Sequence, residues 1–248
     1  LPRMGDYCDG IERINIELSL HNKLKLLDAL DEFFAGDLPL HYQDDAQLGD
    51  TELLGNRPQE AVQLLTTVRA RWQWMLDNLD EALGESLYAP EDKQDAVTVF
   101  DAVQKHLLRA SWKRELRDPL RHLFSGSTYV PILDQCTTIH QDVLKSRVFV
   151  ALHMHAGDGN VHTNIPVNSD DYPMLQQAYA AVDRIMKLAK DLGGVISGEH
   201  GIGITKFEFL EEDEIAPFTE YKQKVDPNGH FNKGKLLKGS GLERAYTP

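Results

Sequence analysis

The sequence feature that most constrains the fold is the segment 148–167, VFVALHMHAGDGNVHTNIPV. Asp158-Gly159 stands there between two runs that are rich in apolar and β-branched residues. An Asp-Gly pair favours a tight turn, because a type I′ turn requires positive φ at both central residues. The segment therefore predicts an antiparallel hairpin with a two-residue loop at Asp158-Gly159, in which His155 lies opposite His162.

Alternation along such a hairpin gives it two faces. The face expected to join the core carries Val148, Val150, Leu152, Met154, Val161, Thr163, Ile165 and Val167. The other face carries His155, His162, and His153 opposite Asn164. Directly opposed residues have Cβ atoms about 5 Å apart, so the spacing allows His155 and His162 to bind one divalent metal ion. A solvated polar sheet face is the alternative interpretation of the same pattern.

A second group of candidate residues lies in the glycine-rich segment GGVISGEHGIG at 193–203. Glycine allows tight turns and the close approach of backbone to a ligand. Glu199 can complete a His-His-Glu site, a set of three protein ligands that leaves one coordination position open. His200 is then a candidate general base beside the metal. A structural turn that holds no ligand is the alternative, because a Glu-His-Gly loop alone is a weak signal.

The rest of the chain predicts an α+β fold in which helices cover an antiparallel sheet. Alternation predicts a half-buried strand at 11–20, and glycines and prolines predict a loop at 37–58 and an irregular tail at 226–248. Apolar residues at spacings of three and four predict a mostly helical segment at about 59–125, which Pro119 interrupts. The individual helices are expected at 22–35, 59–83, 92–117, 131–146 and 171–192, and the one at 92–117 is expected either whole or broken into two.

Charge and composition exclude several classes of partner. The 248 residues carry 26 Lys and Arg against 39 Asp and Glu, a net charge of -13. Such an acidic surface repels phosphate backbones and anionic lipid, so no nucleic-acid partner is expected. No apolar run approaches the ~20 residues of a transmembrane segment. Cys8 and Cys136 are too few for a disulfide scaffold and are expected to be free thiols in a reducing, cytoplasmic environment.

Three motifs together closely resemble the C-terminal part of FAD-linked oxidases and dehydrogenases. They are HAGDGNVH at 155–162, GGVISGEHGIG at 193–203 and DPNGHFNKGK at 226–235. The family includes the D-lactate, glycolate and D-2-hydroxyglutarate dehydrogenases of the vanillyl-alcohol-oxidase superfamily. The resemblance is best over about 127–237 and looser over 36–125. It implies that 1–248 form a single cap-like substrate domain over the flavin of a separate FAD-binding domain.

The resemblance also implies a role for each candidate residue of the two glycine-rich motifs. In metal-dependent relatives, residues at the positions of His155, His162 and Glu199 hold a divalent ion, often Zn²⁺. The histidine at the position of His200 is the base, and the asparagine at the position of Asn160 lies near the substrate.

Two further positions are assigned by resemblance outside these motifs. Asn232 belongs to the segment that approaches the flavin, although Lys233 stands where the family has proline. Arg114 lies in SWKREL at 111–116, which resembles a helix of the family whose arginine binds the substrate carboxylate. A solvated helix face is the alternative for Arg114.

The function that the resemblance implies is the oxidation of a small 2-hydroxy acid to a ketone, with transfer of hydride to FAD. No glycine-rich segment of the kind that binds the flavin pyrophosphate precedes the first predicted strand, so we expect the FAD-binding domain to be absent from this chain and supplied in cis or in trans. The isolated chain is then expected to fold but to be inactive and to retain no FAD. Two alternatives remain open: a metal-dependent hydrolase with the same ligands, and a non-catalytic interaction domain in which 59–125 docks a partner.

Overall fold

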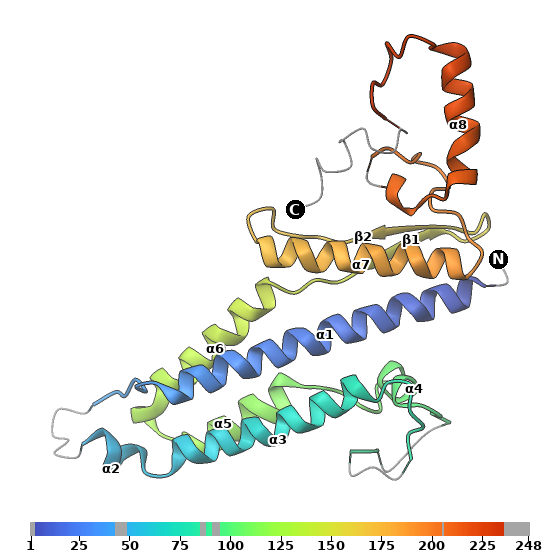
Figure 1. The fold of residues 1–248 in the computed structure, drawn as a ribbon. Coiled ribbons are helices and arrows are strands. Elements are labelled where there is room, and N and C mark those ends of the chain that lie inside the picture. The colour runs from blue at the N-terminus through green and yellow to red at the C-terminus, as the bar shows by residue number, and fades with distance from the viewer. Residues whose placement is uncertain (1–2, 43–48, 85–87, 91–94, 205, 236–248) are drawn as a thin grey trace. The chain divides into compact units, whose positions relative to one another are not determined.

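The computed structural model describes residues 3–42, 49–84, 88–90, 95–204 and 206–235 (Figure 1). The chain divides into two compact units, of which unit 1 comprises Leu1–Ile11 and Val150–Pro248 and unit 2 comprises Glu12–Phe149. Helix α1, Met4–Ala35, begins in unit 1 and continues through unit 2. Helices combine with one antiparallel sheet in the described residues, which confirms the predicted α+β class. The assignment of 1–248 to a single domain stays a prediction.

Unit 2 is helical and has its own apolar core. Besides α1, its elements are α2 (Asp50–Leu54), α3 (Arg57–Asp77), α4 (Val99–Gln104), the π-helical turn η1 (Trp112–Arg117), α5 (Asp118–Leu123), the 3-10 turn η2 (Ser127–Tyr129) and α6 (Val130–Lys145). Side chains at helical spacing fill the core, and Leu27, Leu65 and Trp72 are completely buried. The Trp72 indole N–H donates to Glu115 Oε2 at 3.1 Å, so its polar atom is satisfied inside the core.

The strand predicted at 11–20 is wrong, because these residues belong to helix α1. Ile11 and Ile14 are buried at 1% and 4% exposure, while Ile16 and Leu18 are only half-buried. The apolar residues at positions 11, 14 and 18 fit a helical spacing of three and four, and those at 14, 16 and 18 also fit alternation. A window of ten residues does not distinguish the helical period of 3.6 from the strand period of 2. The segment is helical because it is continuous with the helix predicted at 22–35.

The remaining helices of unit 2 agree with the predictions in part. Helix α6 confirms the one expected at 131–146, whereas α3 ends at Asp77, before the expected end at residue 83. The loop at 37–58 contains the short helix α2, and its positions 43–48 lie outside the described residues.

The segment 92–117, expected as one helix or as two, contains two separate helical elements. Residues 91–94 are not described, and α4 and η1 are separate elements. Pro119 does not interrupt a helix but stands in the first turn of α5, where its missing N–H costs no intrahelical hydrogen bond.

Besides the first residues of α1, unit 1 contains the hairpin and a long helix that follows it. Strands β1 (Ala151–His155) and β2 (Asn160–Asn164) pair antiparallel, and α7 (Tyr172–Asp191), the 3-10 turn η3 (Phe207–Phe209) and α8 (Glu212–Val225) follow. Helix α7 begins and ends as predicted. The Asp171 side chain accepts from the Met174 N–H at 3.0 Å, and Gly193, at φ 73°, follows the last turn.

The predicted register of the hairpin is wrong by two residues. His153 pairs with His162 and His155 with Asn160, so the loop is Ala156–Gly159. Only Gly159 has positive φ in this loop, which rules out the type I′ turn on which the prediction rested. Because the shift is even, each side chain stays on its predicted face.

The apolar face of the hairpin is less covered than expected. Val148 and Val150 are buried, but Met154 is 38% exposed and Val167 is 36% exposed. The described residues contain no third strand. A second core, in unit 1, consists of Ile196, Phe207, Leu210 and Ile215, with Met186 of α7 packed against it. This core fixes the segment after α7 to the helix.

Neither cysteine forms a disulfide, as expected, and the helices were also compared with what a transmembrane segment requires. Cys8 and Cys136 are unpaired, and burial raises the pKa of the Cys136 thiol to about 12. In the described part of the chain, no helix combines the length and the apolarity that crossing a membrane requires.

The turn after α8 is organised by a carboxylate that sequence reasoning did not single out. Asp226 is buried and accepts from Lys222 Nζ at 2.9 Å, the His230 N–H at 2.8 Å and the Phe231 N–H at 3.0 Å. The Lys222 hydrogen bond, followed by the two backbone donors, lowers the pKa of Asp226 to about 2. These contacts hold the first part of the DPNGHFNKGK motif.

We expect Asp226→Asn to lower the thermal unfolding temperature near neutral pH and to have less effect in acid. An unfolded Asp has a pKa of about 3.9. Because the folded pKa is lower, at about 2, the stabilisation is present above about pH 4 and is lost as the pH falls through about 2. Thermal melts near pH 6 and near pH 2.5 measure this change. Asp170→Asn, at an exposed residue, is the control, and an equal Asp226→Asn deficit at both pH values would contradict the assignment.

Candidate functional site

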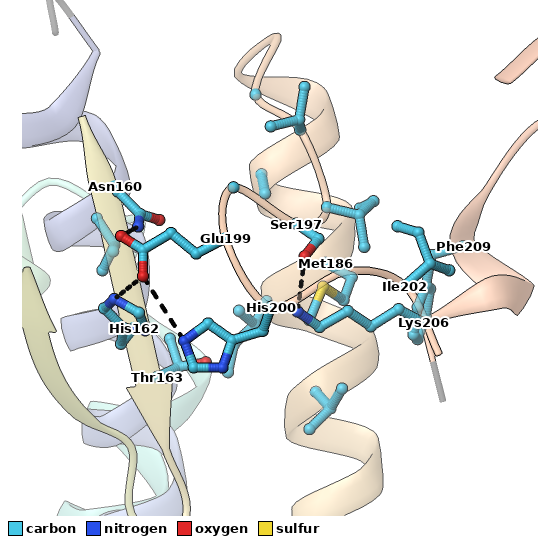
Figure 2. A pocket seen from close by; sticks show the side chains of 18 of the residues that line it. Asn160, His162, Thr163, Met186, Ser197, Glu199, His200, Ile202, Lys206 and Phe209 are labelled. Carbon is cyan, nitrogen blue, oxygen red and sulfur yellow. Dashed lines mark hydrogen bonds and ion pairs between the residues drawn. The ribbon is translucent and has the colours of Figure 1, made fainter. Parts of the chain in front are cut away.

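The hairpin and the loop after α7 bring the predicted metal ligands together, and Figure 2 shows two of them, His162 and Glu199. His155 ends β1 and His162 lies in the middle of β2, so the observed register places them diagonally across the sheet. Their rings still meet edge to face, with centroids 5.6 Å apart at 77°. Glu199 reaches the same point from the loop that follows α7.

The three candidate ligands converge around the Glu199 carboxylate. His155 Nε2 lies 4.0 Å from Glu199 Oε1, and His162 Nε2 lies 3.4 Å from Glu199 Oε2. One ligand atom from each of the three residues lies within 4.8 Å of the other two. The His162 side chain is 19% exposed, whereas those of Glu199 and His155 are 46% and 61% exposed. The cluster is thus anchored on one side and open to solvent on the other.

Two further predicted residues contact the same carboxylate. His200 Nε2 lies 3.6 Å from Glu199 Oε2, and its ring meets that of His162 edge to face at 5.2 Å. Asn160 Nδ2 donates to Glu199 Oε1. Dashed lines in Figure 2 join Asn160, His162 and His200 to the carboxylate. The His200 side chain is 70% exposed, so the ring is accessible from the open side of the cluster.

His153 supports the cluster in a way that the sequence did not reveal. Its ring stacks on that of His162, with centroids 4.7 Å apart and an interplanar angle of 7°. Asn164 Nδ2 lies 3.1 Å from His153 Nδ1, within hydrogen-bonding distance. Alternation correctly placed both residues on the face of His162, but gave no reason to single out His153. The observed register explains its role, because His153 and not His155 lies opposite His162.

The loop that carries Glu199 is held by short-range contacts that were also missed. Ser197 Oγ donates to the Gly201 carbonyl oxygen at 2.8 Å and accepts from Lys206 Nζ at 3.3 Å. Gly198 packs so tightly that a Cβ there would lie 2.9 Å from Asn160 Oδ1. Gly201 has φ 70°, a conformation that favours glycine. The glycines thus allow the loop to approach β2 and to turn back directly after Glu199.

The Glu199 loop and strand β2 line a cavity of about 1270 Å³ within unit 1. Its wall includes the β2 strand with the end of the hairpin loop, one side of α7, the first turn of α1 with Arg3 before it, the loop from 192 to 204, and Lys206, Glu208 and Phe209. Asn160, His162, Glu199 and His200 are all in this wall. A cavity with several converging polar groups is the usual form of a ligand site.

Two predicted site residues are not brought to this cluster by contacts within unit 1. Arg114 belongs to unit 2, where it lies exposed on η1 and its backbone N–H donates to Ser111 Oγ at 3.2 Å. Asn232 belongs to unit 1 but lies beyond α8, exposed and with φ 47°, and it does not line the cavity. Their roles toward carboxylate and flavin stay predictions.

Comparisons with known proteins relate the chain to flavin enzymes. Residues 128–236 match the family model described as FAD linked oxidases, C-terminal domain. The glycolate oxidase subunit GlcD of Escherichia coli (strain K12) is 39% identical over 92 residues, which are 36% of this chain and 18% of that protein. The mitochondrial D-lactate dehydrogenase (cytochrome) 1 of Saccharomyces cerevisiae is 32% identical over 163 residues, 62% of this chain and 27% of that protein. The D-lactate dehydrogenase of Archaeoglobus fulgidus is 40% identical over 88 residues, 34% of this chain and 19% of that protein.

The match is partial in both directions. This chain spans between 18% and 27% of the length of these three relatives. No solved structure matches it. The family match nevertheless covers the hairpin, helix α7, the Glu199 loop and the turn after α8. Residues 128–236, less than half of the chain, are therefore similar to the FAD linked oxidase C-terminal domain family, as the three sequence motifs had indicated.

Proposed function

We propose that this chain is the substrate- and metal-binding part of an FAD-dependent 2-hydroxy-acid dehydrogenase. The observation that carries the proposal is the convergence of His155, His162 and Glu199 beside His200. Of these residues, His162, Glu199 and His200 line the cavity. Glycolate and D-lactate, which appear in the names of these relatives, are both 2-hydroxy acids, and this supports the substrate class. The flavin belongs to an FAD-binding domain supplied in cis or in trans.

The donor set fits a divalent ion, and Zn²⁺ best. Two imidazole nitrogens and one carboxylate oxygen are zinc ligands with bond lengths of about 2.0–2.2 Å, and three protein ligands leave a position for substrate. The three ligand atoms lie within 4.8 Å of one another, so small side-chain movements bring them to that distance from one ion. Bound there, the ion supplies Lewis-acid polarisation of the substrate hydroxyl.

The neighbouring residues have separate tasks in this proposal. His200 would accept the proton of the substrate hydroxyl, and FAD, when bound by its own domain, would accept the hydride from the carbon that carries this hydroxyl. The Asn160 amide holds Glu199 Oε1 and thereby orients the carboxylate, and it lies in the cavity wall where substrate binds. The stack of His153 on His162 fixes the plane of the His162 ring. Such supporting contacts orient ligands and typically contribute 10- to 100-fold to affinity.

The test is anaerobic reduction of flavin in the protein reconstituted from this chain and its FAD-binding domain. D-lactate or glycolate should bleach the oxidised flavin band, chelator should abolish the bleaching, and added Zn²⁺ should restore it. Bleaching that persists at full rate after complete metal removal would rule out the metal-dependent mechanism. Metal-dependent ester hydrolysis by the chain alone, without any bleaching, would instead favour the hydrolase alternative.

Gly198→Ala is expected to weaken Zn²⁺ binding by about tenfold, because its Cβ displaces the Asn160 amide that orients Glu199. The nearest atom is at the end of a side chain, so the fold should survive. Calorimetric titration with Zn²⁺ measures the change. Gly157→Ala is the matched control, since a Cβ there meets nothing within 4 Å. Equal affinities in both variants would show that the close approach of Gly198 to Asn160 has no role in the site.

A further inference from the structure

Lys206 is a half-buried cation in the wall of the cavity that contains Glu199 and His200. Its Nζ donates to Ser197 Oγ at 3.3 Å, as Figure 2 shows, and no carboxylate of the described residues forms an ion pair with it. Two other lysines of unit 1, by contrast, form ion pairs with carboxylates. Lys190 pairs with Glu211 at 2.6 Å, and Lys222 pairs with Asp226 at 2.9 Å.

An unpaired, partly desolvated ammonium is unusual in a chain whose net charge is -13. Acidic side chains are abundant, yet among the described residues no Asp or Glu forms an ion pair with Lys206. A half-buried charge is stabilised by a partner of opposite sign. The position of Lys206 in a cavity wall indicates that this partner is an anion that enters the cavity.

The wall beside Lys206 offers further hydrogen-bond donors. Ser197 Oγ is within reach of Lys206 Nζ and can turn from the Gly201 carbonyl oxygen toward a ligand. The backbone N–H groups of residues 198–203 donate no hydrogen bond within the described part of the chain. These residues also line the cavity. A planar anion with two oxygens would find an ammonium and neutral donors in the same wall.

We propose that Lys206 binds the carboxylate of the substrate, with the Ser197 hydroxyl as a second donor. The inference rests on the proposed function and extends it, because it assigns the acid group of the 2-hydroxy acid to a named cation of unit 1. The flexible stem of lysine allows its point charge to follow a small substrate. The substrate hydroxyl then lies toward Glu199 and His200, and the carboxylate lies toward Lys206.

Equilibrium binding of glycolate to the Zn²⁺-loaded 248-residue chain tests the assignment, with glycolamide as the uncharged analogue and acetate as the analogue without a hydroxyl. We expect Lys206→Met to weaken glycolate binding by about tenfold or more, since a charge-assisted hydrogen bond is lost. Glycolamide binding should change little, and Lys206→Arg should retain most of the affinity for glycolate. Lys187→Met is the matched control, because Lys187 is exposed on α7 and does not line the cavity.

The outcomes separate this inference from the function on which it rests. If Lys206→Met binds glycolate as tightly as the parent chain while Glu199→Gln does not, the carboxylate site is wrong and the metal-dependent function stands. If the loaded parent chain binds glycolate no better than acetate, the proposed function fails and the inference fails with it. Circular dichroism and thermal melts check the fold, and Lys206→Gln replaces Lys206→Met if the latter does not fold.

Discussion

Replacing Glu199 by Gln is expected to lower the affinity of the chain for Zn²⁺ by about 100-fold or more, because an anionic ligand becomes a poor neutral one. The carboxylate is the shared neighbour of His155 and His162, at 4.0 Å and 3.4 Å. Its loss therefore leaves two histidines without their common anionic partner. Calorimetric titration of the metal-free chain measures the effect, with circular dichroism to confirm that the variant is folded.

Glu208→Gln provides the matched control for this substitution. Glu208 is exposed and lines the same cavity, but it lies in η3 and belongs to no cluster of potential metal ligands among the described residues. The variant should bind Zn²⁺ as the parent chain does. An equal loss in both variants would mean that the acidic character of the cavity attracts the ion, and the His-His-Glu assignment would have to be abandoned.

Replacing His200 by Ala is expected to lower kcat of the reconstituted flavoprotein by about 10²–10⁴, the usual contribution of a general base. Zn²⁺ affinity should change far less, because His200 contacts the ligand Glu199 at 3.6 Å but is not part of the three-residue cluster. The two measurements together distinguish a base from a ligand. His230→Gln, at an exposed histidine beyond α8, should leave both quantities unchanged.

A loss of Zn²⁺ binding in His200→Ala comparable to that in Glu199→Gln would contradict the role given to His200. So would a kcat within a few-fold of the parent value. His200 is 70% exposed and packs only edge to face on His162, so its removal should not destabilise unit 1. A large fall in the unfolding temperature would therefore also count against a purely chemical role.

The local part of the candidate site was accessible from the sequence. Alternation placed His153, His155, His162 and Asn164 on one face, and this conclusion survived an error of two residues in the register. An N-terminal cap of α7 at Asp170 or Asp171 and a turn at Gly193 were predictable for the same reason, since each depends on a few adjacent residues, and the structure has the cap at Asp171. Local patterns determine which side chains share a face or an element end.

What escaped prediction depends on contacts between distant segments. The hydrogen bond from Lys206 to Ser197 depends on the path of a loop, which no hydrophobic periodicity predicts. The role of Asp226 is evident only from the backbone N–H groups that donate to its carboxylate in the folded chain. The convergence of Glu199 on the hairpin was suggested by glycine content and resemblance, but its 3.4 Å approach to His162 is a tertiary fact. The strand predicted at 11–20 failed because two periods fit the same short window.

The four-residue loop Ala156–Gly159 has a consequence for how such sequences can diverge. Directly paired residues of an antiparallel hairpin share a face, so a change in the length of this loop leaves His153, His155 and His162 on one face as long as β1 and β2 keep their pairs. Hairpin loops of two to five residues are all common. The loop should therefore accept insertions and deletions that the paired segments cannot accept, because a one-residue slip within a strand moves its side chains to the opposite face.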